Sequence, residues 1–390
     1  MTDLRIGPFA DGIDNVSKDA GLRPSALRTC IDMDIDRTGW PGTRVGQALA
    51  SATAGVHSLW SDGAQLYGAV GTSLVSIAGD YSRTTLATLP STGPVSFSAG
   101  PDRVYFAQSS IVGQIRDGAA REVGAPDGMI VAATAAGSGG LTAGQYTVAL
   151  AFVGPSGEEG GLSGIASVAV AEGGGIALTL VWPAGALSAI VYRSGAGGDV
   201  LYRCATVPNG MTSYSVGAGP LGGAASTHYM RRPPGGHIVR WWKGRLLIAR
   251  GDTLWCTEPF RTHLCKPATA FVRFPGRIRM VEGVEGGVWV AAKTVQFLPG
   301  ADPAQWSPVT TTAALPVPGC SAVADSSLFN PELGLGQSQC AVWFGGRGFA
   351  LGSASGQLIE PRARTFSFTR APRSGSLVLH DRRITAFIQS

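Results

Sequence analysis

The chain has 390 residues, a formal net charge of +5, 15% charged residues and 44% hydrophobic residues. So much apolar surface excludes a disordered chain, and no apolar run reaches the ~18 residues that a membrane-spanning helix needs. The first residues, MTDLRIGPF, lack the basic start and apolar run of a secretory signal. The six cysteines are widely spaced and form no C-x-x-C pair, so we expect buried, reduced thiols in a protein made in the cytosol.

Positive charge comes almost entirely from arginines that are scattered along the chain. The densest groups are small: Arg231-Arg232, Arg362 to Arg364, and Arg382-Arg383. A nucleic-acid-binding surface usually gathers its basic residues on one face or along one element. The charge pattern therefore argues against a dedicated DNA-binding site.

Residues 1–52 do not alternate cleanly between apolar and polar and predict an arm ahead of the repeats. A strand expected at Cys30–Ile35 leads into Asp36 and would place Asp32, Asp34 and Asp36 on one face. The run resembles a D-x-D-x-D calcium loop, but its glycine falls late and no bidentate glutamate follows. We interpret it as a solvated acidic face, and the sequence leaves open whether these aspartates bind a cation.

From residue 53 a strand–turn–strand pattern recurs: an alternating strand, a tight turn with Gly, and a second strand that carries an aromatic residue. Most copies start about forty residues apart, which is the length of a four-stranded propeller blade. They are VHSLWSDGAQLYGAV from Val56, VSFSAGPDRVYFAQ from Val95, IVRWWKGRLLIAR from Ile238, RMVEGVEGGVWVAAKTVQFL from Arg279, CAVWFGGRGFAL from Cys340 and SLVLHDRRITAFI from Ser376. The pattern predicts an all-β fold with a β-propeller of about five to seven blades.

Residues 128–230 interrupt this pattern. The segment is rich in Gly, Ala and Ser, and its short strands follow one another at about ten-residue spacing, which is typical of a β-sandwich of the immunoglobulin or fibronectin type III kind. Trp182 and Tyr192 are its expected aromatic core. We therefore predict an inserted domain that separates a first propeller part, 53–127, from a second part, 231–390, since loop closure tolerates long insertions.

The last repeat has two strands where a full blade has four. We expect an N-terminal strand near Leu4–Phe9 to complete it and so remove an exposed sheet edge.

No phosphate-binding loop, dinucleotide fingerprint, nucleophile elbow or H-E-x-x-H motif occurs in the sequence. The glycine groups lie between strands and read as hairpin turns; they are Gly173 to Gly175, Gly286-Gly287 and Gly345-Gly346. His380-Asp381 is expected in a turn as well. Cys256, His263 and Cys265 lack the paired spacing of a structural zinc site. We predict no catalytic, cofactor-binding or metal-binding residues.

Two further residue sets could carry function. Propeller hydrolases place paired carboxylates at the central channel, and the candidates here are Glu282, Glu285, Glu258, Asp252 and Glu360. Tryptophans could stack on sugars or bases, but their places in alternating strands favour packing between blades; they are Trp60, Trp241, Trp242, Trp255, Trp289, Trp306 and Trp343. Trp241 and Trp242 must point to opposite faces, so one of them is expected near a surface.

Three segments resemble the β-propeller nozzle or hub proteins of bacteriophage tails. They are the opening GIDNVSKDAGLRPSALRTCIDMDIDRTGWPGTRVG, the insert with LTAGQYTVALAFVGPSGEEGGLSGIASVAV and IVYRSGAGGDVLYRCATVPNGMTSYSV, and the blade segment GGVWVAAKTVQFLPGADPAQWSPV. Cys30 and Ile31 depart from the family pattern, which more usually has an asparagine-bearing segment there. None of the three segments is a catalytic fingerprint.

The resemblance implies a structural virion protein that is assembled in the host cytoplasm. Such a protein forms a homo-oligomeric ring, commonly a hexamer, and extends the portal–adaptor channel. It anchors tail fibre or spike proteins and lets double-stranded DNA pass. The resemblance implies no enzyme activity, no cofactor and no membrane insertion. Two alternatives remain open: a glycan-binding receptor-recognition propeller and a propeller glycoside hydrolase.

Overall fold

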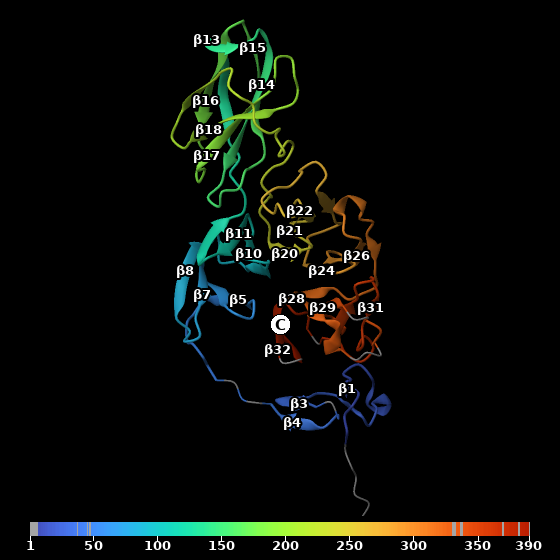
Figure 1. Ribbon diagram of the computed structural model, residues 1–390. Coiled ribbons are helices and arrows are strands. Elements are labelled where there is room, and N and C mark those ends of the chain that lie inside the picture. The colour runs from blue at the N-terminus through green and yellow to red at the C-terminus, as the bar shows by residue number, and fades with distance from the viewer. Residues whose placement is uncertain are drawn as a thin grey trace, which may run out of the picture. The chain divides into compact units, whose positions relative to one another are not determined.

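The computed structural model describes residues 7–36, 38–44, 46, 48–329, 333–335, 338–368, 370–380 and 383–389. In this part of the chain strands dominate, no α-helix occurs, and three short 3-10 helices lie at Asp19–Gly21 (η1), Pro303–Gln305 (η2) and Ser326–Leu328 (η3). The protein is an all-β chain of propeller blades with an inserted β-sandwich, as predicted (Figure 1).

The chain divides into two compact units, which we describe separately. One unit holds Val56–Ala78 and Arg83–Arg273, and the other holds Met1–Gly55, Gly79–Ser82 and Phe274–Ser390. The sandwich belongs to the same unit as the first three blades.

Each of the five blades in the described residues is a four-stranded antiparallel sheet whose strands follow one another in chain order. The first two blades are β5 (Val56–Ser61), β6 (Leu66–Val70), β7 (Ser73–Ile77), β8 (Arg83–Thr88), and β9 (Ser96–Ala99), β10 (Val104–Gln108), β11 (Ile111–Arg116), β12 (Ala119–Glu122). The third is β20 (Ile238–Trp242), β21 (Arg245–Arg250), β22 (Thr253–Cys256), β23 (Phe271–Arg273). The fourth and fifth are β24 (Met280–Val284), β25 (Gly287–Ala291), β26 (Val295–Pro299), β27 (Val309–Thr310), and β28 (Pro316–Asp325), β29 (Gln339–Gly345), β30 (Gly348–Gly352), β31 (Leu358–Ile359).

Local turn chemistry sets the register of these hairpins. In the β20–β21 hairpin Trp242 pairs with Arg245, which leaves a two-residue loop of Lys243 (φ 46°) and Gly244 (φ 78°). Positive φ at both loop positions is the type I′ geometry that matches the twist of paired strands. Asp117 (φ 51°) and Gly118 (φ 72°) form the same turn between β11 and β12.

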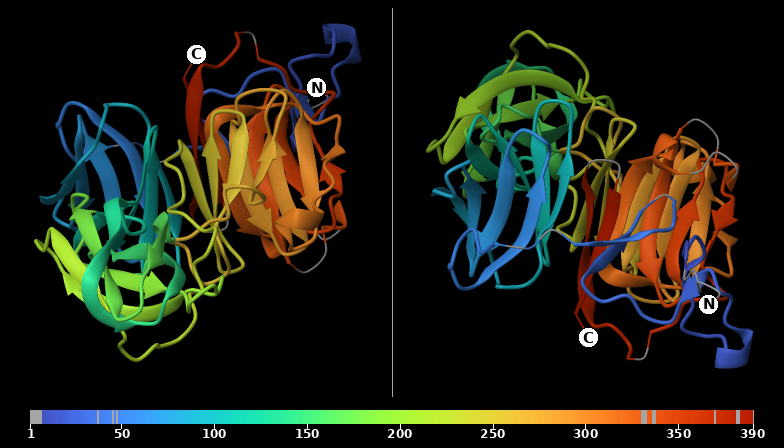
Figure 2. Two further views of the ribbon diagram at one scale, coloured as in Figure 1. Left: turned by 90° about the horizontal axis from the view of Figure 1, so that it is seen from above. Right: turned by 90° about the horizontal axis from the view of Figure 1, so that it is seen from below.

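Aromatic rings cover glycines in the strands, which explains much of the glycine content. Phe106 pairs across the sheet with Gly113, and a Cβ atom on that glycine would lie 2.1 Å from the ring. Between the fourth and fifth blades, a Cβ atom on Gly352 would lie 2.4 Å from the indole of Trp289. Figure 2 shows these two blades (orange to red) side by side. Glycine therefore serves the packing as well as the turns.

The sandwich consists of two sheets. One has the order β13 (Met129–Leu141), β16 (Gly174–Val181), β19 (Ser213–Val216), and the other has β15 (Ser163–Val170), β14 (Gly144–Val153), β17 (Ser188–Arg193), β18 (Tyr202–Pro208). Its first strand, β13, was not predicted, because its Gly, Ala and Ser residues have low strand propensity. Trp182 is partly buried and meets Phe152 edge-on at 5.4 Å, whereas Tyr192 packs in a separate cluster.

The N-terminal arm contains short elements. They are β1 (Gly12–Ile13) paired parallel to β2 (Ala26–Leu27), and an antiparallel ribbon of β3 (Met33–Ile35) and β4 (Pro41–Thr43). The strand expected at Cys30–Ile35 is therefore shorter, and Asp32 takes a left-handed backbone (φ 53°) just before it.

A second antiparallel ribbon, β32 (Ser374–His380) with β33 (Arg383–Gln389), packs beside β28 of the fifth blade (Figure 1). The strand expected to complete it, Leu4–Phe9, falls in part outside the described residues. Its described portion, Gly7–Phe9, is not in a strand. The predicted turn at Asp381 also lies outside the described residues.

All six cysteines are free, and four of them are buried: Cys256, Cys265, Cys320 and Cys340. Burial raises the pKa of Cys320 and Cys340 to about 11 and that of Cys256 and Cys265 to about 12. A raised pKa keeps each thiol protonated and unreactive at any pH well below that value.

We therefore expect iodoacetamide at pH 8 to modify these four thiols at least about a hundredfold more slowly in the folded protein than in urea. Cys30, which is half-exposed, is the internal control. Counting labels by mass spectrometry checks this, and fast labelling of any of the four in the folded chain would contradict it.

No helix in the described residues is long and apolar enough to cross a bilayer.

Candidate functional site

Two adjoining pockets, of about 420 and 350 Å³, lie in the unit that holds the first three blades. Pro101, Asp102, Arg103 and Arg116 line both pockets. We call the two together the polar groove.

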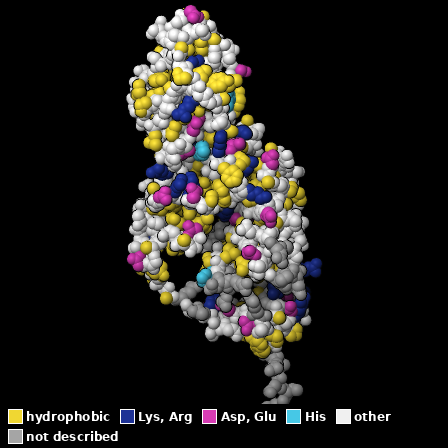
Figure 3. Space-filling view, in the orientation of Figure 1, with side chains coloured by type: hydrophobic (Ala, Val, Ile, Leu, Met, Phe, Trp, Pro, Cys, Tyr) yellow, Lys and Arg dark blue, Asp and Glu magenta, His cyan; other side chains and the backbone are white. Residues whose placement is uncertain are grey.

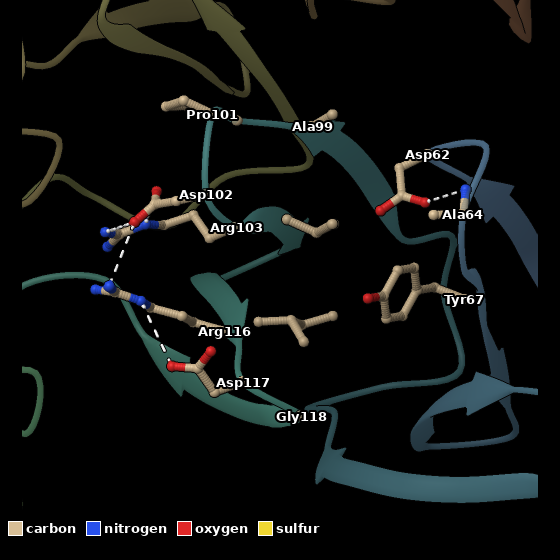
Figure 4. Close-up of a pocket in the computed structure, with 13 residues that line it drawn as sticks. Asp62, Ala64, Tyr67, Ala99, Pro101, Asp102, Arg103, Arg116, Asp117 and Gly118 are labelled. Carbon is tan, nitrogen blue, oxygen red and sulfur yellow. Dashed lines mark hydrogen bonds and ion pairs between the residues drawn. The ribbon is translucent and has the colours of Figure 1, made fainter.

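The first pocket lies between the first and second blades. In Figure 4, Asp62 and Tyr67 of the first blade face a chain of ion pairs on the second. Asp102 accepts two hydrogen bonds from Arg103, at 2.8 and 2.7 Å, and also pairs with Arg116 at 3.6 Å. The hydrogen bonds from Arg103 lower the pKa of Asp102 and hold it ionised. Each of these charged side chains therefore has a partner of opposite charge.

The second pocket is lined by residues of the second and third blades and of the sandwich. Tyr105 stacks on Trp241 with ring centroids 5.9 Å apart, and its hydroxyl lies 3.2 Å from the Thr262 hydroxyl. Burial raises the pKa of Tyr105 and lowers that of His263, so both are neutral at pH 7. Trp241 is thus the tryptophan of its pair that lies near a surface, while Trp242 is buried, as the alternation required.

One polar group in this pocket is unsatisfied. Both carboxylate oxygens of Glu158 are buried, and none of the described residues donates to them. The hydrogen bond to Asp102 is the main cause of the raised pKa of Arg103, and the nearby charge of Glu158 adds to it.

Four of the five predicted carboxylate candidates are held by hydrogen bonds or an ion pair, and the fifth is exposed in a turn. Glu282 is buried and accepts a hydrogen bond from Ser321 at 2.7 Å. Glu360 accepts one from the Ala314 amide at 3.0 Å. The others are Glu258, which pairs with Lys266 at 3.3 Å, Asp252, which accepts from Thr253 at 2.9 Å, and Glu285, which is exposed in the turn between β24 and β25. None of the five lines the polar groove.

The aspartates of the arm also have local roles. Asp34 pairs with Arg44 at 3.1 Å, and Asp36 accepts hydrogen bonds from Thr38 and from the Trp40 amide. Among the described residues no group of three or more His, Cys, Asp or Glu side chains could hold a metal ion, and this includes the neighbourhood of Cys256, His263 and Cys265.

Two strongly exposed aromatic residues, one of which lines the second pocket, were not predicted from the sequence. Phe260, which lines the pocket, is 84% exposed at φ 57°, and Tyr229 is 80% exposed at φ 58°. The left-handed region is strained for residues with a bulky side chain, and exposure costs an aromatic ring its burial energy. The loops of these two residues are joined by the backbone pairing of Arg231 with Cys265. No sequence pattern signals a left-handed phenylalanine.

The surface drawn in Figure 3 shows no basic field. Lys and Arg side chains are interspersed with Asp and Glu over this face. The scattered arginines of the sequence thus remain scattered on the face that is drawn.

The fold and the groove define a β-propeller protein with an inserted sandwich. No protein-family model and no curated protein matches the chain. Among solved structures, it is similar to a streptogramin B lyase (9% identity, TM-score 0.34, 84% of this chain and 89% of that chain). It is also similar to BBS1N in complex with ARL6DN (11%, 0.32, 86% and 88%) and to a gluconolactonase from Xanthomonas campestris (9%, 0.31, 83% and 82%). Two of the three are enzymes by name, and at such identities no activity passes to this chain.

Proposed function

We propose that this chain is a structural protein of a bacteriophage tail that assembles into a ring and performs no catalysis. The observation that carries the proposal is the strained exposure of Phe260 and Tyr229, the two most exposed of the three aromatic residues with positive φ and an exposed side chain. Aromatic residues are enriched at protein–protein interfaces, where a few of them supply most of the binding energy. Both are costly in an isolated subunit, and contact with a neighbouring protein offsets that cost.

The layout supports the same proposal. An arm, a split set of blades and an inserted sandwich provide several separate contact surfaces, as a ring between a portal–adaptor complex and tail fibres requires. Asp102, Arg103 and Arg116 of the groove pair with one another, and none of the five candidate acids lines it, although the buried carboxylate of Glu158 does. Passage of double-stranded DNA through such a ring is favoured by weak contacts, because tight binding through counterion release would slow transit.

Native mass spectrometry and negative-stain microscopy test the proposal. We expect closed rings, with six copies as the resemblance implies, that dock on a portal–adaptor complex. A stable monomer that binds no tail protein would contradict it.

Substitution of the two aromatics gives a sharper prediction. Phe260→Gly together with Tyr229→Gly removes both rings and relieves the left-handed strain, so the free energy of unfolding of the monomer should change by no more than about 1 kcal/mol. Assembly should weaken by at least about thirtyfold, the effect of losing one interface hot spot. Analytical ultracentrifugation and urea unfolding measure the two effects.

The matched control is Ser109→Gly, which changes another exposed position with positive φ (44°) without removing an aromatic ring. It should assemble normally. Normal assembly of the double glycine variant would rule out these aromatics as contacts.

A second candidate function is glycan binding. It is favoured by the second pocket, which combines the stacked Tyr105 and Trp241 rings with polar groups in a concavity of about 350 Å³. Concave sites of this size with aromatic walls and a few polar groups suit small ligands. Binding of an oligosaccharide by a stable monomer, abolished by Trp241→Ala, would favour this function over the ring.

A further inference from the structure

Strand counts set two segments apart from the rest of the propeller. Each of the five blades has four strands, whereas the antiparallel ribbons β3–β4 and β32–β33, like the short parallel pair β1–β2, have two strands and pair with no further strand in the described residues. A two-stranded ribbon is marginally stable alone in water. Its free edges are also templates for pairing with another chain.

The β32–β33 ribbon has a face that packs and a face that does not. Leu377, Leu379 and Ile384 pack against the buried cluster of the fifth blade. Val378 and Phe387 are 46% and 49% exposed. Four-stranded blades bury both faces of their central strands, so this ribbon resembles half of a blade.

The β3–β4 ribbon also exposes apolar side chains. Ile31 is 77% exposed, Met33 38% and Trp40 44%. Together the two ribbons supply the four strands of one blade.

Their charges are complementary as well. Residues 30–44 carry three aspartates and two arginines, one of which, Arg44, pairs with Asp34, and residues 361–390 carry six arginines and one acidic residue. Opposite charges steer two surfaces together and fix their register. The acidic run at Asp32, Asp34 and Asp36 would thus add a contact between copies to its local hydrogen bonds and ion pair.

The N-terminal arm is attached to the segment that precedes the β32–β33 ribbon. The Asn15 side chain donates to the Ser367 carbonyl at 2.8 Å and accepts from the Ser367 backbone amide at 2.9 Å. The backbone amide of Asn15 donates to the Thr365 carbonyl at 2.9 Å. These contacts hold the arm to the segment that leads into β32, while β3–β4 stays unpaired with β33. In a ring of identical copies, each subunit meets its neighbour through two different surfaces.

We propose that the β3–β4 ribbon of one copy pairs with the β33 edge of the next copy and completes a four-stranded blade across the subunit interface. Main-chain hydrogen bonds supply the affinity in such strand addition, and side chains on alternate positions supply the specificity. This inference rests on the proposed ring.

Cross-linking of two full-length versions tests the pairing. One version carries Met33→Cys and the other Phe387→Cys, both with Cys30→Ser, and the two differ in tag mass. After mixed assembly and mild oxidation, we expect heterodimeric disulfides in at least about tenfold higher yield than with Thr84→Cys in place of Phe387→Cys, since disulfides require Cα atoms within about 7 Å. Thr84 is exposed on β8 and serves as the matched control.

Hydrogen exchange gives an independent readout. The amides of Ile384–Gln389 should exchange at least about tenfold more slowly in the ring than in the monomer. Asp32→Lys with Asp34→Lys should weaken assembly about tenfold, and Arg370→Glu with Arg373→Glu in the partner copy should restore it.

Rings in which the β33 amides exchange as fast as in the monomer would overturn the inference and leave the ring itself standing. A disulfide within one monomeric chain that carries both cysteines would also overturn it. Failure to form any ring would contradict the proposed function together with the pairing.

Discussion

Replacing Trp289 by alanine is expected to cost about 3–5 kcal/mol of the free energy of unfolding, the range for truncating a fully buried large aromatic. The indole is 0% exposed and joins the fourth and fifth blades. Its ring lies 5.7 Å from that of Trp343 and 5.0 Å from that of Phe297, and its Nε1 donates to the Ser353 carbonyl at 3.0 Å. Alanine leaves a cavity between the blades and an unpaired carbonyl. Denaturant unfolding followed by far-UV circular dichroism measures the loss.

Two companion variants separate the causes of this loss. Trp289→Phe keeps most of the apolar volume and loses the hydrogen bond to Ser353, so about 1–2 kcal/mol should be lost. Gly352→Ala should cost about 1–3 kcal/mol in the native background, because its Cβ would lie 2.4 Å from the indole. That cost should nearly vanish when Trp289 is already alanine, since the two positions share one space. Additive effects would show that the ring does not pack on the glycine.

Replacing Gly161 by alanine is the second substitution with a large expected effect. Its backbone is not left-handed, so the cost is steric: a Cβ atom would lie 1.7 Å from the Met230 carbonyl oxygen. Backbone hydrogen bonds on both sides of that carbonyl hold it in place. The Met230 amide donates to Thr227 at 3.1 Å, and Arg231 pairs with Cys265 through two backbone hydrogen bonds of 2.9 and 2.8 Å.

We expect Gly161→Ala to cost at least about 3 kcal/mol, at or above the upper end of the range for overpacking. We also expect faster proteolysis of the segment 217–237, because the clash separates it from the sandwich. Gly195→Ala is the matched control in the same sandwich, since nothing lies within 4 Å of its added Cβ, and it should be neutral or slightly stabilising. If both variants had the same free energy of unfolding, the close approach of Gly161 to the Met230 carbonyl would not be the cause of any loss.

Much of the fold could be predicted from the sequence because it depends on neighbouring residues. A strand's alternation and the positive φ of a turn such as Lys243-Gly244 are encoded within a few positions. These local signals sufficed for the hairpins of the blades and for the class of the inserted module. They failed at β13, whose small residues have little strand propensity of their own and which becomes a strand by pairing with β16.

The candidate site was far less predictable. Its residues come from separate elements, and the pairing of Asp102 with Arg103 and Arg116, or of Tyr105 with Trp241, exists only once those elements are packed. The strained exposure of Phe260 and Tyr229 is likewise invisible in a one-dimensional pattern. The residue type alone does not predict this exposure, because large aromatic side chains are usually at least partly buried.

The sequence by itself determined the main hairpins of the blades, their turns and the order of the modules, since these depend on the pattern of apolar residues and on local backbone preferences. Only the tertiary structure decided which glycines lie beneath aromatic rings, which aromatics face solvent and which ribbons remain two-stranded. Those outcomes depend on contacts between residues far apart in the chain, and no local pattern of residues specifies them.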